Sequence, residues 1–147
     1  GYRQTLMMRG LPLDPVLVCD EVVNNAAQEG YEAVEALVAL RQPPTAIFAA
    51  SDELALGVLA ALHDLGRRVP DDMAVGSIDD TSVASVVRPA LTTVHVPTDS
   101  LATYAIRILD THEAYPDSQP ASIVLPTELI IRESCGAKRV LSDIPSN

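Results

Sequence analysis

The chain has 147 residues, of which 48% are hydrophobic; this is typical of one globular domain and excludes an intrinsically disordered protein. Its net charge of −10, from 20 acidic and 10 basic residues, disfavours direct binding to the phosphate backbone of nucleic acids. No apolar run approaches the roughly 20 residues that a membrane-spanning helix needs, so we expect no membrane partner.

In chain order, residues 1–8 are typical of a helix already in progress, because no capping residue precedes them. Gly10 and Pro12 end this helix. The apolar run of residues 16–19, which contains two β-branched valines, predicts a short strand buried on both faces. Cys19, at the end of the run, would then be a small buried hydrophobic side chain.

The middle of the chain alternates between helix and strand patterns. Helical spacing of apolar residues predicts a helix over 30–41, which a proline pair ends. Residues 46–49 predict a buried strand, residues 52–65 a helix, and residues 73–78 a third strand. Strands and helices that alternate at this spacing indicate βαβ units and a parallel sheet.

The last third of the chain has shorter elements. A short helical stretch is expected over 81–87, an extended piece over 91–96, and a helix with an apolar stripe over 98–112. Two further short strands are predicted at 123–125 and 129–131.

Patterns typical of enzymes and metal sites are missing from the sequence. The three histidines show no metal spacing with one another or with Cys19 and Cys135, and neither a GxSxG motif nor a glycine-rich phosphate loop occurs. No Glu or His is spaced to complete a general acid–base pair. We therefore expect no enzyme activity, no metal and no cofactor. Because the two cysteines suggest no disulfide framework, a reducing cytoplasm is the expected location.

Polar side chains follow each of the predicted parallel strands. They are Asp20 after the first strand, the Ser51-Asp52 pair after the second and the Asp79-Asp80 pair after the third. Ligands of parallel α/β sheets bind beyond the carboxyl ends of the strands, where such groups can hold a polar small molecule. Helix capping alone would also explain Ser51 and Asp52. Adjacent strand residues point to opposite faces, so Asp79 and Asp80 are not expected to share one site.

The helix predicted over 52–65 has more apolar surface than one side of a sheet requires. A subunit partner would cover the excess, and the candidate dimer contacts are Leu54, Leu56, Val58 and Ala61. The alternative is that other parts of the same chain bury this helix.

Taken together, several stretches resemble LacI/GalR-type bacterial transcriptional regulators. PTAIFAASDELALG at 44–57 strongly resembles the core motif of these proteins, and GRRVPDDMAV at 66–75 looks like its continuation. PALTTV at 89–94 and LIIRES at 129–134 complete the series in family order. The first motif alone would also suit periplasmic sugar-binding proteins of the same fold. The resemblance covers nearly all of residues 1–135.

The resemblance implies a type I periplasmic-binding-protein-like fold, a three-layer α/β/α arrangement with a parallel sheet, represented mostly by its C-terminal subdomain. Residues 1–93 and 121–135 would form this subdomain. Residues 94–113 would be a crossover segment that belongs to an N-terminal subdomain preceding this chain. The apolar stripe of the crossover would then lack its partner, and we expect it to self-associate or repack. Residues 136–147 are expected to form a flexible tail.

The resemblance also implies a small-molecule effector, a sugar or related metabolite, in the cleft between the subdomains. In the family the residues at the positions of Ser51 and Asp79 often contact the effector, and the position of Asn25 is commonly an aromatic that packs on it. Asp79, Ser51 and Asn25 are therefore the candidate effector contacts. Ser77 stands where the family usually has a glycine.

These inferences favour a homodimeric, ligand-responsive regulator of the repressor type. Operator DNA would be contacted only through a helix-turn-helix that precedes Gly1. The alternative is a periplasmic solute-binding protein of a sugar transporter, which shares the fold. The Leu91–Thr93 motif and the spare apolar surface of the 52–65 helix favour the regulator, because transport receptors are usually monomers.

Overall fold

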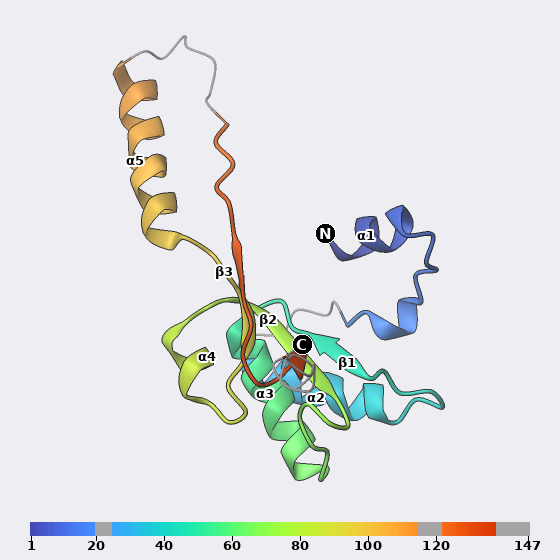
Figure 1. Ribbon diagram of the computed structural model, residues 1–147. Helices are drawn as coiled ribbons and strands as arrows, with labels where there is room; N and C mark the ends of the chain where they lie inside the picture. The colour runs from blue at the N-terminus through green and yellow to red at the C-terminus, as the bar shows by residue number, and fades with distance from the viewer. Residues whose placement is uncertain (20–24, 115–121, 138–147) are drawn as a thin grey trace, which may run out of the picture.

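The computed structural model describes residues 1–19, 25–114 and 122–137 (Figure 1). Helices and strands alternate through most of this length. In chain order they are α1 (Tyr2–Met8), a short 3-10 helix (Pro15–Leu17), α2 (Ala26–Val38), β1 (Ala46–Phe48), α3 (Asp52–Asp64), β2 (Ala74–Asp79), α4 (Ser82–Val86), β3 (Thr92–His95), α5 (Thr98–Ala114) and β4 (Glu128–Ile130).

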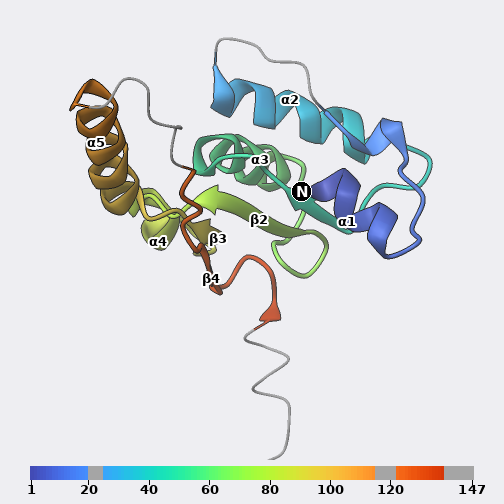
Figure 2. The ribbon, with the colours of Figure 1, turned by 90° about the horizontal axis from the view of Figure 1, so that it is seen from above.

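The strands form one four-stranded sheet in the order β1-β2-β3-β4. The first three strands run parallel, and β4 pairs antiparallel with β3. This confirms the predicted α/β class with a mainly parallel sheet. Helices α3 and α2 stack on one side of the sheet (Figure 2), and α3 is the helix that packs extensively on a strand, β2.

The hydrophobic core lies between α3, α2 and the sheet. Leu62 and Val34 are fully buried there, from α3 and α2, together with Val75 of β2. The two helices cross closely because each has a glycine at the crossing. A Cβ on Gly30 would overlap the carbonyl oxygen of Leu54, and a Cβ on Gly57 would overlap that of Ala27.

Helix α3 begins and ends close to where the sequence predicts. The Ser51 hydroxyl accepts a hydrogen bond of 3.1 Å from the Leu54 N–H, so Ser51 is the N-cap. Gly66, just beyond the C-cap Leu65, has φ +66°, a backbone angle that glycine adopts without strain. Local capping chemistry therefore determines both ends of this helix.

Two predicted strands are wrong. Residues 16–19 do not form a buried strand: the 3-10 turn at Pro15–Leu17 is capped by Asp14, Val16 is 59% exposed, and Cys19 is exposed. Asp14 followed by proline favours a helical turn, and none of the strands that the structure describes pairs with the run. Residues 123–125 are extended but pair with no strand among the described residues, and Val124 is 91% exposed.

The structure also corrects part of the predicted dimer face. Val58 and Ala61 are 3% and 0% exposed, and both belong to the core of this chain, so they cannot contact a second subunit. Leu54 is half-buried and packs against the same core, while Leu56 is half-buried. The reason is that α2 packs along α3 and covers one side of the apolar stripe.

Helix α5 stands apart from the body of the molecule (Figure 1). None of its side chains is buried, and Leu101, Ile106 and Leu109 are all exposed. Strand β3 continues to His95, so the first two residues of the predicted crossover segment 94–113 lie in the sheet. Most of the predicted tail, residues 138–147, lies outside the described residues, as does Asp20. None of the described helices is both long and apolar enough to span a membrane.

Candidate functional site

The carboxyl ends of β2 and β3 meet a buried carboxylate, that of Asp52 at the start of α3. Asp52 is 1% exposed. Its Oδ1 accepts hydrogen bonds from the hydroxyls of Ser77, at 2.6 Å, and Thr93, at 2.8 Å. These two residues are register partners on neighbouring parallel strands, so their side chains share one face of the sheet. Strand register therefore places both hydroxyls on the same oxygen.

The second oxygen of Asp52 binds the loop that follows β2. Its Oδ2 accepts from the backbone N–H of Thr81 at 2.7 Å and from the Thr81 hydroxyl at 2.9 Å. Burial by itself raises the pKa of the Asp52 carboxyl, but the hydrogen bonds from Ser77, Thr81 and Thr93 outweigh it and lower the pKa below its ordinary value. Asp52 is thus an ionised, fully bonded carboxylate.

Strand β2 ends in an unusual turn at the aspartate pair. Asp79 has φ 123° and Asp80 has φ 59°, and both angles are uncommon for residues with a side chain. The backbone N–H of Asp80 donates to the Thr93 hydroxyl at 3.3 Å. Consecutive positive φ angles break the regular strand alternation here, so a strand rule alone does not describe how these two side chains are directed.

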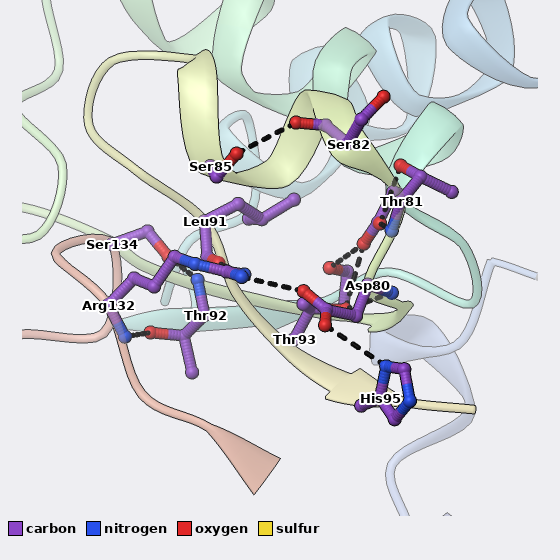
Figure 3. A network of polar contacts seen from close by, with 12 residues as sticks. Asp80, Thr81, Ser82, Ser85, Leu91, Thr92, Thr93, His95, Arg132 and Ser134 are labelled. Carbon is purple, nitrogen blue, oxygen red and sulfur yellow. Dashed lines mark hydrogen bonds and ion pairs between the residues drawn. The ribbon is translucent and has the colours of Figure 1, made fainter. Parts of the chain in front are cut away.

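Asp80 belongs to a charged cluster that joins three strands (Figure 3). Its Oδ1 accepts from Arg132 Nη2 at 2.7 Å, and its Oδ2 lies 3.1 Å from His95 Nδ1. Arg132 also donates to the Leu91 carbonyl at 2.9 Å. Asp80 and Arg132 are mostly buried, so solvent screens this pair less than a surface ion pair.

Asp79, in contrast, is exposed. Among the described residues its carboxylate makes no hydrogen bond or ion pair. An ionised carboxylate of this kind can accept several hydrogen bonds from a polar ligand. The turn therefore holds two adjacent aspartates with different surroundings: Asp80 is bonded within the protein, and Asp79 is available.

The other two predicted contacts cap helices. Ser51 caps α3, and Asn25 caps α2 by accepting from the Gln28 N–H at 3.2 Å. Ser51 follows β1 at the same edge of the sheet as Asp79, so the structure brings these two to one end of the strands. No hydrogen bond links Asn25 to either of them within the described ranges.

Sequence reasoning did not identify Thr93, His95 and Arg132 as part of this region. Thr93 and Arg132 lie in stretches that carry the family resemblance, but neither motif says which atoms they bond. Helix capping is one explanation that the sequence offers for Asp52, whereas in the structure Ser51 is the cap and Asp52 bonds the strands and the loop. The one sequence signal that could have indicated a bonded network is the Thr92-Thr93 pair beside Leu91 in a predicted strand, because polar side chains that a strand buries need hydrogen-bond partners.

The gathered groups suit binding better than catalysis. Within the part of the chain that the structure describes, no cluster of three or more His, Cys, Asp or Glu side chains is placed to hold a metal ion. Asp52 accepts four hydrogen bonds from the protein, and each oxygen of Asp80 already has a protein partner. A mainly parallel sheet whose polar groups meet beyond the strand ends is the form of a small-molecule-binding domain.

Comparison with known proteins agrees with this class. The model of the periplasmic binding protein-like domain family matches residues 1–135. The chain therefore belongs to this family, and its homologues are LacI-family regulators.

Two curated relatives are the HTH-type transcriptional regulator CelR of Thermobifida fusca, 35% identical over 134 residues, and catabolite control protein A of Priestia megaterium, 34% identical over 135 residues. Each alignment covers 91% of this chain but only 39% and 40% of the relative. The chain thus spans about two-fifths of the length of these relatives.

Solved structures show the same fold. A LacI-type regulator from Bacillus cereus subsp. cytotoxis superimposes with a TM-score of 0.85 at 31% identity, over 92% of this chain and 47% of that chain. A CelR–cellobiose complex superimposes with a TM-score of 0.76 at 33% identity, over 90% of this chain and 40% of that chain. The likeness to regulators confirms the family predicted from the motifs.

Proposed function

We propose that this chain is the part of a LacI-type transcriptional regulator that binds a small-molecule effector, a sugar or a related metabolite. The observation that carries the proposal is the exposed carboxylate of Asp79, which makes no hydrogen bond or ion pair with any other described residue and lies at the end of β2 beside a buried hydrogen-bonded network. Carboxylates that accept from vicinal hydroxyls are a common means of holding a sugar in such a cleft.

Ser51 and Asn25 are the next candidate contacts. Both use a side-chain oxygen to cap a helix, but the Ser51 hydroxyl can still donate its proton and the Asn25 amide still has two N–H groups. Together with the carboxylate of Asp79 they would offer one O–H and two N–H donors and a carboxylate acceptor to a polyhydroxylated ligand. The relative solved as a complex with cellobiose, at 33% identity, supports a sugar as the ligand class.

Effector response in the intact regulator tests this proposal. Thermal unfolding of the full-length protein is measured against a panel of sugars that includes cellobiose and ribose, because a specific ligand raises the midpoint by mass action. Asp79→Ala should abolish the midpoint shift and the change in operator affinity, while basal operator binding stays intact. Glu35→Ala, which removes an exposed carboxylate on α2, is the matched control and should respond as wild type. An unchanged response in Asp79→Ala would contradict the assignment.

The regulator would work as a cytoplasmic homodimer. Because Val58 and Ala61 are buried, the remaining candidate contacts on α3 are Leu56 and, at its edge, Leu54. Leu56→Glu should shift the sedimentation of the full-length protein from dimer to monomer while its circular dichroism stays unchanged. A variant that remains dimeric would exclude this face.

The mechanism follows from effector preference. Effector binding would favour one relative pose of the two subdomains and change operator affinity through the dimer, and this requires the effector to bind one pose more tightly than the other. A solute-binding receptor of a transporter shares the fold, but the relatives named above are transcriptional regulators, which favours the regulator.

A further inference from the structure

We propose that Asp52 and Thr93 are positioning residues for effector binding, which hold the Asp79–Thr81 turn so that the Asp79 carboxylate is presented at the strand ends. The inference rests on the proposed function of Asp79 as an effector contact. Neither Asp52 nor Thr93 touches the ligand itself, because both side chains are buried inside the protein.

The turn needs to be held because its backbone is unfavourable. Asp79 at φ 123° and Asp80 at φ 59° are consecutive residues in a region that side chains disfavour. Such conformations persist only where surrounding contacts impose them. Without those contacts, the chain after β2 would relax toward negative φ, and the Asp79 carboxylate would change direction.

Two backbone amides directly after Asp79 supply those contacts. The Thr81 N–H donates to Asp52 Oδ2 at 2.7 Å, and the Asp80 N–H donates to the Thr93 hydroxyl at 3.3 Å. The same hydroxyl donates to Asp52 Oδ1 at 2.8 Å. Both amides are therefore connected to the Asp52 carboxylate: the Thr81 N–H bonds it directly, and the Asp80 N–H is linked to it through the Thr93 hydroxyl.

Asp52 is not needed for the usual purpose of an aspartate at this place. Ser51 already caps α3, and the four hydrogen bonds of Asp52 go to β2, β3 and the turn rather than to its own helix. The Asp80 carboxylate is occupied by Arg132 and His95. Among the side chains and amides of Asp80 and Thr81, the network thus bonds both carboxylate oxygens of Asp80, both N–H groups and the Thr81 hydroxyl, whereas the Asp79 carboxylate is left for a ligand.

Backbone hydrogen exchange tests the positioning role without any ligand. In Thr93→Val, which keeps the shape of the side chain but loses its hydroxyl, the Asp80 amide should exchange roughly ten-fold faster or more. In Asp52→Asn the Thr81 amide should accelerate similarly, because only one acceptor oxygen remains for the four bonds that the two carboxylate oxygens accept. Thr93→Ser restores the hydroxyl and should restore slow exchange. The Val75 amide donates to the Ser134 carbonyl in the sheet, away from the turn, and its exchange rate should be unchanged.

Two results would overturn the inference at this stage. One is unchanged exchange of Asp80 in Thr93→Val. The other is an equal acceleration of Val75, which would mean that the substitution only loosens the whole fold. Thr103→Val, which removes an exposed hydroxyl from α5, is the matched control for the loss of a threonine hydroxyl and should leave all three amides unchanged.

Affinity in the full-length protein completes the test, with cellobiose and ribose as the probes. Thr93→Val should weaken binding about ten-fold relative to wild type, and Thr93→Ser should recover it. If Asp79→Ala loses binding but Thr93→Val and Asp52→Asn bind as wild type, the positioning role is wrong and the proposed function stands. If wild type binds neither sugar, the choice of sugars fails, and the exchange result still decides whether the turn is held.

Discussion

Helices α3 and α5 both have apolar residues at helical spacing but lie in very different surroundings. Six residues of α3 are buried, among them Val58 and Leu62, because α2 covers one side of the helix and β2 the other. No residue of α5 is buried, although Leu101 and Leu109 form an apolar stripe at helical spacing. An amphipathic pattern therefore predicts a helix, while its burial depends on the segments that other parts of the protein bring to it.

Among substitutions that distinguish α3 from α5, the largest loss of stability is expected for a core residue of α3. Leu62→Ala removes a fully buried side chain and should lower the free energy of unfolding by about 2–5 kcal/mol. Urea denaturation followed by circular dichroism measures the change. A loss below about 1 kcal/mol, the range of a surface substitution, would mean that α3 is not packed as described.

A second substitution tests the close crossing of α2 and α3. In Gly57→Ala the new methyl group would overlap the Ala27 carbonyl, so the helices must separate, at a cost of about 1–3 kcal/mol. Gly76→Ala is the control: its Cβ would meet the Phe48 ring at an ordinary distance of 3.6 Å, and stability should change little. The same denaturation assay compares them, and equal losses would contradict the crossing geometry.

Acid should lower the free energy of unfolding through protonation of Asp52. Hydrogen bonds hold its folded-state pKa below the ordinary value of 3.8, so its contribution to stability is present above about pH 4 and is lost as pH falls through the lower folded value. Unfolding free energy of wild type should fall more steeply below pH 4 than that of Asp52→Asn. Asp72, whose pKa is lowered to about 2 by its hydrogen bond with Arg68, acts in the same window, so Asp72→Asn is measured in parallel. Identical slopes in wild type and Asp52→Asn would refute the effect.

The smallest effect is expected on α5. Leu109 is 68% exposed, so Leu109→Ala should change the unfolding free energy of this chain by no more than about 0.5 kcal/mol. If the full-length protein shows a loss of several kcal/mol for the same substitution, α5 is covered there by a segment beyond this chain. That result would support the prediction that residues 94–113 belong to a second subdomain.

Much of the fold between residues 46 and 79 could be predicted because its signals are local. Ser51 caps α3, Gly66 follows its end, and the apolar runs at 46–49 and 73–78 correspond to β1 and β2 within a residue or two. The run at 16–19 was predicted by the same rule and is wrong. An apolar stretch becomes a strand only where a neighbouring strand pairs with it, and the residues of the stretch do not specify that partner.

The candidate site could be predicted only in part. The position of Asp79 after a strand indicated a ligand contact, and its exposed carboxylate fits that prediction without testing it. Ser77 was noticed only as a departure from the glycine usual in the family; in the structure its hydroxyl binds Asp52. The partners of Asp80 could not be foreseen, because Arg132 is 52 residues away in sequence.

The sequence by itself determined the helices and strands that local capping and hydrophobic spacing specify, the mainly parallel sheet, and the family. Only the tertiary structure decided which side of α3 is buried and what Asp52 does. The physical reason is that these features depend on contacts between distant segments: Asp52 bonds Ser77 and Thr93, which are 25 and 41 residues away. Sheet register places both hydroxyls on one carboxylate, and register is a property of the assembled strands.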